Sequence, residues 1–366
     1  MENLPNELRT EILFHLPIKS LVRLKCVSKS WLSLISNPNF PKLHFQRSPQ
    51  HYTHRFPYIV VSHHQRMRAI DFRMRAIDFS VSPRDDSAAI SFDYPSDYNE
   101  FMLASCRGFL LLIHKEKRDK LLVWNPLTGE RKQILLPKTQ MNFELNGFCY
   151  DESTDDYFIV LVSFIVGPAF RIFSIRNNSW NKEFVINRPE TMAPNNPLVS
   201  GLVVNGVIYW KVSFTEEQGI PKVNILALDI KTNQVRRVVP NINDIDLALC
   251  NLRLLGESLA LVDLAYYEVI TVWVMKEGEG ESSWTKHMSV PRSREASPMG
   301  SPICFTKDGQ LVTLLCLTFL RWSSQQGKLE EVGKLEEDRT YGYPVYSHYA
   351  PVYTETLLSL PPTQNA

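Results

Sequence analysis

The side chains best suited to chemistry in this sequence are histidines that gather in one short stretch. Five of the nine histidines fall between positions 44 and 64, namely His44, His51, His54, His63 and His64. A zinc site needs four ligands, usually with cysteines at fixed intervals, and no cysteine lies near these histidines. The pattern therefore favours a polar surface connector over a metal centre, and we expect neither a metal nor another cofactor.

The other reactive residue types show no spacing that is typical of catalysis. Gly278 and Gly280 lie in an acidic turn with no helical pattern after it, so they do not form a phosphate-binding loop. The sequence has no GxSxG, HExxH or P-loop motif, and no arrangement of serine, histidine and aspartate singles out a triad. We therefore expect a binding protein rather than an enzyme.

Composition and charge narrow the kind of partner. With 366 residues, of which 44% are hydrophobic and 22% charged, the chain is long enough for two globular domains with a real core. The net charge of +1 indicates neither a nucleic acid nor a membrane partner. Residues 1–48 hold seven Lys and Arg against three Glu, which suits either an acidic partner or solvated basic helices.

Cysteine usage and hydropathy indicate the compartment. The six cysteines are scattered without a CxxC pair, as in proteins whose thiols stay reduced and mostly buried. Residues 1–30 carry charges throughout instead of a signal peptide. The longest apolar run, Tyr157 to Val166, is well short of the ~20 residues that a membrane span needs. We expect a protein of the cytoplasm, the nucleus or both.

The first 47 residues show three short helical segments, and any functional side chains in this part of the chain must be positioned by these helices. Apolar residues recur at helical spacing in 4–16, in 18–25 and from Val27 to Ile35, and prolines follow the first and third segments. A unit of about 40 residues rarely buries enough surface to be stable alone. Its surplus apolar residues need either the following domain or another protein to cover them, and the spacing leaves both open.

The residue types of this segment are more specific than their spacing. The string runs from Leu4-Pro5 through Leu16-Pro17 to Trp31, continues to Phe40 and His44 without a gap, and resembles the F-box motif, especially its plant form. The resemblance implies a small all-α, three-helix head that binds a Skp-family adaptor, which joins F-box proteins to cullin and RING subunits. By motif position, the adaptor-binding residues are Leu4, Pro5, Leu8, Ile12, Leu13, Leu16, Pro17, Leu21, Val22, Leu24, Val27 and Trp31. Some of these must also form the internal core of the head, and the sequence does not divide the two roles.

From about residue 50 the sequence changes to short β-branched and aromatic runs that are broken by turn residues. Five turn signals recur every 46 to 52 residues and each follows a strand-like run; they start at positions 125, 177, 229, 277 and 323. A second turn signal lies upstream in most units, as at Asn205-Gly206. Several strands in each unit of this length predict a large all-β domain, a kelch-like β-propeller of about six blades, with a β-sandwich as the alternative.

Aromatic landmarks in this region resemble the F-box-associated domain of plants, which is kelch-like. They include Trp124-Asn125-Pro126, Gly147-Phe148, Asp155-Asp156-Tyr157, Asn205-Gly206-Val207 and Val272-Trp273, although the paired glycines of ordinary kelch blades are missing. We expect Trp124, Trp210 and Trp273 to be core residues rather than contacts for a target. The implied domains are an F-box at 1–47, a connector with an irregular first β unit at 48–100, and a substrate-binding domain at 101–360.

Together the two resemblances imply a substrate-recognition subunit of an SCF-type (Skp–cullin–F-box) ubiquitin ligase. Such a subunit is a non-catalytic adaptor that brings a target protein to the ligase for ubiquitination and degradation. Two alternatives stay open: a Skp-binding module without a ligase role, and a propeller oxidase. The expected target-binding segments are the polar or proline-rich connections 91–100, 138–146, 187–200, 213–221, 241–246 and 291–301. The sequence indicates neither single target-binding residues nor the target itself.

One duplication interrupts this pattern. Residues 66–72 are repeated without change as residues 73–79. Because seven is odd, inserting one copy into a strand would reverse its inside–outside alternation. We therefore expect the duplication to lie in a loop, and we expect deletion of one copy to leave folding and adaptor binding intact.

Overall fold

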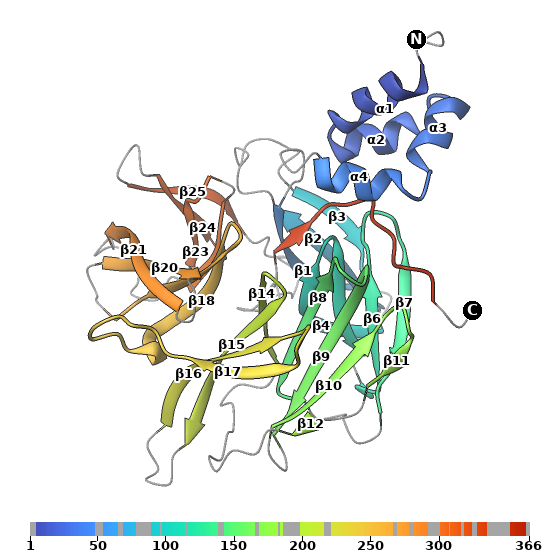
Figure 1. Ribbon diagram of the computed structural model, residues 1–366. Coiled ribbons are helices and arrows are strands. Elements are labelled where there is room, and N and C mark those ends of the chain that lie inside the picture. The colour runs from blue at the N-terminus through green and yellow to red at the C-terminus, as the bar shows by residue number, and fades with distance from the viewer. Residues whose placement is uncertain are drawn as a thin grey trace.

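In the computed structural model, four short helices form a head that sits on one end of a ring of antiparallel sheets (Figure 1). The structure describes residues 5–47, 54–64, 69–77, 89–95, 97–114, 116–137, 143–164, 168–181, 184–185, 198–215, 221–265, 269–277, 282–291, 301–306, 308–315, 318–323, 328–334 and 352–363. None of these residues belongs to a helix that is long and apolar enough to cross a membrane.

The head contains one helix more than the sequence predicted. Its described helices are α1 (Asn6–Phe14), α2 (Ile18–Leu24), α3 (Lys29–Ile35) and α4 (Phe40–Arg47). The first three match the expected segments, whereas the three-helix prediction overlooked α4. Pro41 lies in the first turn of α4, where its missing N–H costs nothing. The carbonyl of Asn37 accepts the backbone N–H of Phe40 (2.9 Å), so the prolines of this segment do not prevent the helix.

The head has a small core that all four helices share. Leu13, Leu21 and Ile35 are buried, and the ring of Phe14 stacks on that of Phe40 with centroids 5.4 Å apart. His44 is buried beside these rings, and its Nε2 lies 3.1 Å from the carbonyl oxygen of Leu16. This first histidine of the sequence cluster is therefore a core residue of the head, so the expectation that it belongs to a polar surface connector was wrong.

The described strands form six sheets, and every pair of hydrogen-bonded strands among them is antiparallel except β13 with β8. Three of the sheets, with strands in spatial order, are β26 (Tyr353–Thr354), β1 (His54–His64), β2 (Ala69–Ile77), β3 (Ala89–Asp93); β4 (Tyr98–Cys106), β5 (Phe109–His114), β6 (Lys120–Trp124), β7 (Arg131–Leu135); and β11 (Ser179–Trp180), β10 (Ala169–Ser174), β9 (Asp156–Ser163), β8 (Leu145–Asp151), β13 (Val199–Ser200), with β12 (Phe184–Val185) beside β10.

The other three sheets have four strands each. They are β14 (Leu202–Val204), β15 (Val207–Thr215), β16 (Pro221–Asp229), β17 (Gln234–Val238); β18 (Cys250–Leu255), β19 (Ser258–Asp263), β20 (Val269–Glu277), β21 (Ser282–Pro291); and β22 (Ser301–Phe305), β23 (Leu311–Leu315), β24 (Thr318–Ser323), β25 (Lys328–Lys334). A short 3-10 helix, Leu247–Leu249, precedes β18.

The turn signals found in the sequence occupy equivalent places in these sheets. Asn125–Gly129 connects β6 to β7 and Asp229–Asn233 connects β16 to β17, so this signal marks the turn from a third to a fourth strand. Asn205-Gly206 marks the turn from a first to a second strand, and both of its residues have positive φ. Local backbone requirements therefore explain why the same turn residues recur in the sequence, because few residues other than Gly, Asn and Asp tolerate a positive φ.

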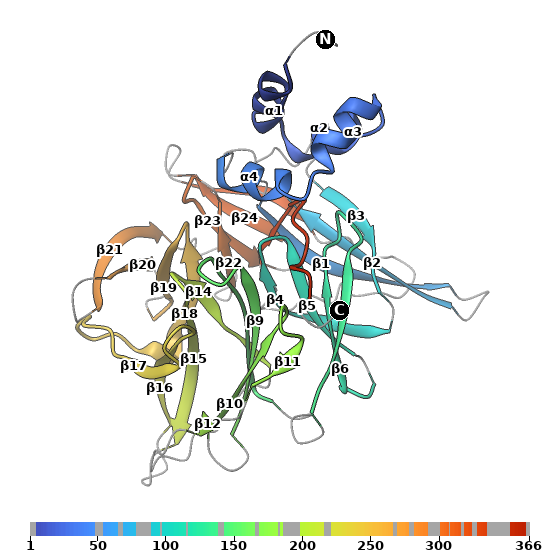
Figure 2. The same ribbon diagram turned by 45° about the vertical axis from the view of Figure 1, so that its right-hand side comes forward.

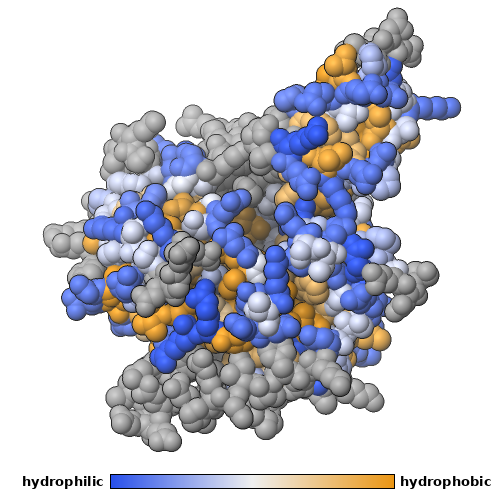
Figure 3. Space-filling model, in the orientation of Figure 1, coloured by the Kyte–Doolittle hydropathy of each residue, from blue (hydrophilic) through white to orange (hydrophobic). Residues whose placement is uncertain are grey.

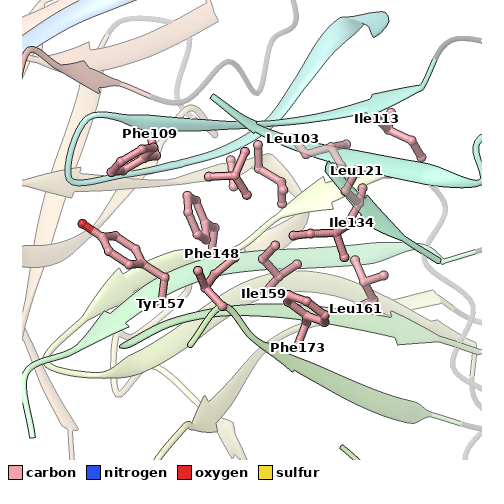
Figure 4. Packing of buried hydrophobic residues seen from close by; sticks show 14 of the residues in the cluster. Leu103, Phe109, Ile113, Leu121, Ile134, Phe148, Tyr157, Ile159, Leu161 and Phe173 are labelled. Carbon is pink, nitrogen blue, oxygen red and sulfur yellow. The ribbon is translucent and has the colours of Figure 1, made fainter. Parts of the chain in front are cut away.

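Four of the sheets pack against a neighbour on each face, as the blades of a propeller do: those of β4–β7, β8–β13, β14–β17 and β18–β21. Along β9, Ile159 and Leu161 pack in the cluster shared with β4–β7 (Figure 4), whereas Val160 and Val162 pack in the cluster shared with β14–β17. A two-layer sandwich would leave one face of each sheet toward solvent. Burial of both faces also explains why inner strands such as Phe109–His114 read as unbroken apolar runs.

The C-terminal strand joins the first sheet, so both ends of the β domain meet there. In the first sheet, β26 pairs with β1 through His54 with Thr354 and Arg55 with Tyr353. Trp124 and Trp210 are buried core residues, as predicted, and Trp273 is partly buried in the same kind of position.

The duplicated heptad does not lie in a loop, so this expectation was wrong. Strand β2 spans the junction: Ala69–Phe72 come from the first copy and Arg73–Ile77 from the second. Both parts pair with β1, and only the second part also pairs with β3. The odd repeat is tolerated because the first copy extends the β1–β2 hairpin beyond β3 instead of being inserted within the three-stranded part. That one copy can be deleted without effect stays a prediction.

Candidate functional site

The structure divides eleven of the twelve predicted adaptor-binding residues into three groups. Leu8, Ile12, Val22 and Val27 keep 53%, 44%, 37% and 67% of their surface exposed, and Pro5 and Pro17 are exposed as well. Leu16, Leu24 and Trp31 are half-buried. Leu13 and Leu21 are fully buried and have no surface to offer a partner. Leu4 lies outside the described residues.

Helix α1 carries two residues of the exposed group, and their spacing places them on the same face of the helix. Leu8 and Ile12 are four residues apart, so they lie one above the other on one face of the helix. Leu13 and Phe14 follow at once and turn into the head core. Pro5 stands immediately before the helix and stays exposed beside its first turn. This helix therefore anchors itself with one side and leaves an apolar stripe on the other.

The start of α3 positions the next part of the exposed group. The side chain of Ser28 caps the helix by accepting the backbone N–H of Trp31 at 3.2 Å. Because Ser28 is in the extended conformation, the chain turns just before it and leaves Val27 outside. The guanidinium of Arg9 donates to the hydroxyl of Ser30 at 2.6 Å, which ties α1 to α3.

The exposed apolar surface is larger than the motif positions alone. Ten large apolar side chains stand out as exposed among the described residues, and six of them belong to the head. Two of the six, Leu32 on α3 and Leu43 on α4, were not predicted. Orange residues on the head in Figure 3 show apolar surface between polar side chains. So much exposed apolar surface on a small helical unit is typical of a protein-binding site.

Charges around this surface are mostly basic. Arg23 and Lys29 are exposed and close in sequence to Val22 and Val27. The carboxylate of Glu11 is engaged by His15 (3.6 Å) and Arg47 (3.8 Å), and these exposed pairs add little to stability. The head therefore offers a partner apolar contacts with positive charge at their edge, which suits an acidic surface.

The described strands that flank the expected target-binding segments have their joining ends on the side of the sheets that faces away from the head. The head touches turns that join first to second or third to fourth strands, such as those that contain Arg107, Asp155 and Leu127. All six expected segments instead join second to third strands or the fourth strand of one sheet to the first of the next. Figure 2 shows the head above one end of the sheets. Because strands alternate in direction, these two sets of connections lie at opposite ends.

Only the segment 241–246 lies wholly within the described residues, and the other five extend outside them. Ile242 and Ile245 of this segment pack partly against the core shared by β14–β17 and β18–β21. Asp246 caps the short 3-10 helix by accepting the backbone N–H of Ala248 at 2.9 Å. The residues that the structure describes contain no group of three or more His, Cys, Asp and Glu side chains that could hold a metal ion.

Comparison with known proteins assigns both parts of the chain. Residues 1–43 match the family of the F-box domain, and residues 58–351 match that of the F-box associated beta propeller domain. An F-box/kelch-repeat protein of Arabidopsis thaliana is 28% identical over 311 residues, which cover 79% of this chain and 80% of the relative.

Two further relatives, both named as putative F-box proteins of Arabidopsis thaliana, show similar identities. One is 25% identical over an alignment of 389 residues that covers 99% of this chain and 97% of the relative. The other is 25% identical over 240 residues, which cover 64% of this chain and only 60% of the relative. The chain thus belongs to the family of F-box proteins with an F-box associated beta propeller domain.

Proposed function

We propose that this protein is the substrate-recognition subunit of an SCF-type ubiquitin ligase. In this proposal the head binds a Skp-family adaptor, and through it cullin and RING subunits, while the propeller binds a target protein for ubiquitination. The observation that carries the proposal is the group of six exposed apolar side chains on a head that matches the F-box domain. The protein itself breaks no bonds; it raises the concentration of the target near the enzyme that carries ubiquitin.

Burial of the exposed group would supply a useful part of the binding free energy. Fully burying an aliphatic side chain of this size contributes about 1.5–3 kcal/mol. Leu8, Ile12, Val22 and Val27 keep between a third and two thirds of their surface exposed, so each would contribute about 1 kcal/mol when an adaptor covers it. The four together would contribute roughly 4 kcal/mol, which is about a thousandfold in affinity.

The twelve motif residues then take different parts in this binding. The exposed side chains contact the adaptor directly, and Leu16, Leu24 and Trp31 contribute their remaining surface. Leu13 and Leu21 act indirectly because they hold the helices in place. The same proposal divides the chain into an F-box at 1–47, a first β unit at 48–100 and a substrate-binding domain at 101–360, and it places the protein in the cytoplasm, the nucleus or both.

We also propose that each of the six sheets is one blade of the propeller. Closure of the first sheet by the C-terminal strand β26 supports this count, because pairing between chain ends completes one blade of a ring. The target would then bind at the end of the blades that faces away from the head, where the strands flanking the six expected segments end.

Co-purification with a recombinant Skp-family adaptor tests the first step. The variant Leu8→Asp/Ile12→Asp should lose at least a hundredfold in adaptor affinity, because two buried apolar contacts become uncompensated charges. Leu135→Asp is the matched control: Leu135 is 69% exposed but lies on β7 of the propeller. Adaptor binding that both variants retain equally would contradict the proposal.

Reconstitution with adaptor, cullin, RING subunit and ubiquitin-charged enzyme tests the second step. Ubiquitin transfer that depends on Leu8 and Ile12 supports the ligase role. Adaptor binding without any cullin association would instead assign the protein to the class of Skp-binding modules that act outside a ligase.

A further inference from the structure

The C-terminal segment Tyr353–Leu360 lies between the head and the ring, and five of its first six residues are buried. Tyr353 and Thr356 have no exposed surface, and Leu357 and Leu358 keep less than a tenth of theirs. Figure 1 shows this segment, in red, passing directly below the helices of the head before it runs along the sheet of β4–β7. A segment at the end of the described chain is rarely so enclosed unless it connects other parts.

Two adjacent leucines of this segment point into different cores. Leu357 belongs to the core of the head, together with Leu13, Phe14 and Phe40. Leu358 belongs to the propeller core between β4–β7 and β8–β11, together with Phe109. In an extended chain neighbouring side chains point to opposite sides. The segment therefore joins the two cores with consecutive residues.

Hydrogen bonds hold the backbone of this segment on the ring. The side-chain amide of Asn125 donates to the carbonyls of Thr356 (3.2 Å) and Leu358 (3.3 Å). The hydroxyl of Thr356 donates to the carbonyl of Arg107 at 2.9 Å, and the backbone N–H of Leu360 donates to Glu130 at 3.0 Å. The backbone on both sides of Leu357 is thus hydrogen-bonded to the ring, which fixes the position from which Leu357 contacts the head.

A second contact fixes the head from the side of α4. The ammonium of Lys42 lies 2.6 Å from a carboxylate oxygen of Asp155, in the turn between β8 and β9. The other oxygen of Asp155 accepts the hydroxyl of Tyr150 at 2.6 Å, and Arg176 donates to the same carboxylate at 2.8 Å. Because Tyr150 and Arg176 hold the carboxylate in place, Lys42 pairs with a fixed partner rather than a mobile one.

Arg107 connects all three parts. Its guanidinium lies over the ring of Phe45 on α4, 4.6 Å from the centroid, and over the ring of Tyr150 on the propeller, 3.8 Å from the centroid. Its backbone carbonyl accepts the hydroxyl of Thr356. One residue thus contacts the head, the ring and the C-terminal segment.

We infer that the C-terminal segment, Arg107 and the Lys42–Asp155 pair hold the head in one fixed orientation, so that head and ring move as one body. Leu357, Arg107 and Asp155 are positioning residues in this arrangement, because they touch neither the exposed apolar surface nor the far end of the sheets. An adaptor on the head and a target on the ring would then be held at a fixed distance. That consequence rests on the proposed function, whereas the fixed orientation does not.

A distance measurement tests the orientation directly. Spin labels on the exposed Cys26 of the head and on Lys231→Cys, in the turn between β16 and β17, report the head-to-ring distance by electron–electron double resonance. Cys316, which lies outside the described residues, is replaced by Ser in all variants. The parent chain should give one narrow distribution. Leu357→Ala and the milder Lys42→Ala/Asp155→Ala should each broaden it at least about twofold. A broad distribution in the parent, or an unchanged one in both variants, would overturn the inference.

Two matched controls separate positioning from general loss of stability. Leu358→Ala removes the neighbouring leucine from the propeller core, and Arg321→Ala removes an ion pair with Glu330 (3.5 Å) inside one sheet. Hydrogen exchange should become at least about tenfold faster in α1–α4 for Leu357→Ala, and in β5 and β9 for Leu358→Ala. Arg321→Ala should leave the distance distribution unchanged. Equal loosening of the head by Leu357→Ala and Leu358→Ala would contradict a specific role for Leu357.

The functional arm uses the reconstituted ligase. Lys42→Ala/Asp155→Ala should keep adaptor affinity within about twofold, because it leaves the exposed apolar surface intact, yet should lower ubiquitin transfer several-fold. A parent chain that transfers no ubiquitin refutes the proposed function, while the distance measurement still decides the inference. Full transfer by a variant with a broadened distance distribution would refute the functional consequence alone.

Discussion

Gly108, in the turn between β4 and β5, is placed so that any side chain would displace the C-terminal segment. A Cβ at this position would lie 2.0 Å from the hydroxyl oxygen of Thr356 and 3.0 Å from the carbonyl oxygen of Thr354. Gly108 also has a φ of +89°, which costs an L-residue about 1–2 kcal/mol. Overpacking a buried site adds about 1–3 kcal/mol. Gly108→Ala should therefore lower the free energy of unfolding by about 2–5 kcal/mol.

Gly206 provides the matched control, because it occupies the equivalent place in the turn between β14 and β15. Its φ is +79°, and a Cβ there would meet nothing within 4 Å. Gly206→Ala should cost only the backbone term of about 1–2 kcal/mol. Guanidinium denaturation followed by tryptophan fluorescence measures both variants, and the difference between them isolates contact with the C-terminal segment.

A double-mutant cycle identifies the atom responsible. Thr356→Gly removes the obstructing side chain, so Gly108→Ala should cost about 1–3 kcal/mol less in that background than in the parent. If Gly108→Ala and Gly206→Ala destabilise the protein equally, the close approach of Thr356 does not exist in solution and the reasoning is refuted.

Three further outcomes follow from the same junction and from the cysteines. Asn125→Ala should lower the free energy of unfolding by about 1–2 kcal/mol more than Asp229→Ala does. Both side chains accept turn N–H groups, but only the Asn125 amide also donates to two buried carbonyls. Equal melting temperatures of the two variants would contradict this. Burial raises the pKa of Asp155, but hydrogen bonds from Lys42 and Tyr150 outweigh burial and hold that pKa below its usual value. The Asp155 contribution is therefore present above about pH 4 and lost as the pH falls through the lowered value. The protection of α4 against hydrogen exchange, taken relative to the intrinsic exchange rate at each pH, should fall at acid pH in the parent but not in Asp155→Ala. Maleimide should modify the exposed Cys26 quickly. Burial raises the pKa of the Cys250 and Cys304 thiols to about 12, so these two thiols should react only on unfolding, as peptide mass spectrometry would show.

Features that depend on a few neighbouring residues could be predicted from the sequence. The repeat of turns was visible because positions such as Asn205-Gly206 need a positive φ, which restricts the residue type locally. The three helices of the head were visible because apolar spacing and flanking prolines act within one or two turns. The family resemblance also predicted a Skp-family adaptor as the partner of the head, which spacing alone left open.

Helix α4 shows where local rules misled. The stretch Asn37–Pro41 contains two prolines, which argued for an end to the helical region. The chain instead starts a new helix at Phe40, because Phe40 and His44 are buried against Phe14 of α1. Tertiary packing overrode local propensity here, as it routinely does for short helices.

The division of the motif into surface and core likewise needed the structure. Ile12 and Leu13 are adjacent and chemically alike, yet one is exposed and the other has no exposed surface. Their surroundings, not their types, make the difference, because three other helices cover only one side of α1.

The sequence by itself determined which local structures this chain forms and to which family it belongs. Short-range backbone preferences and apolar spacing carry that information, so it can be read without knowing where the elements meet. Only the tertiary structure decided how head and ring are joined. Leu357 and Leu358 look interchangeable in the sequence, and Gly108 looks like any turn glycine. Their roles arise because the C-terminal segment returns to residues about 250 positions earlier, as in the hydrogen bond from Thr356 to Arg107 (a separation of 249), and no local pattern records such a contact.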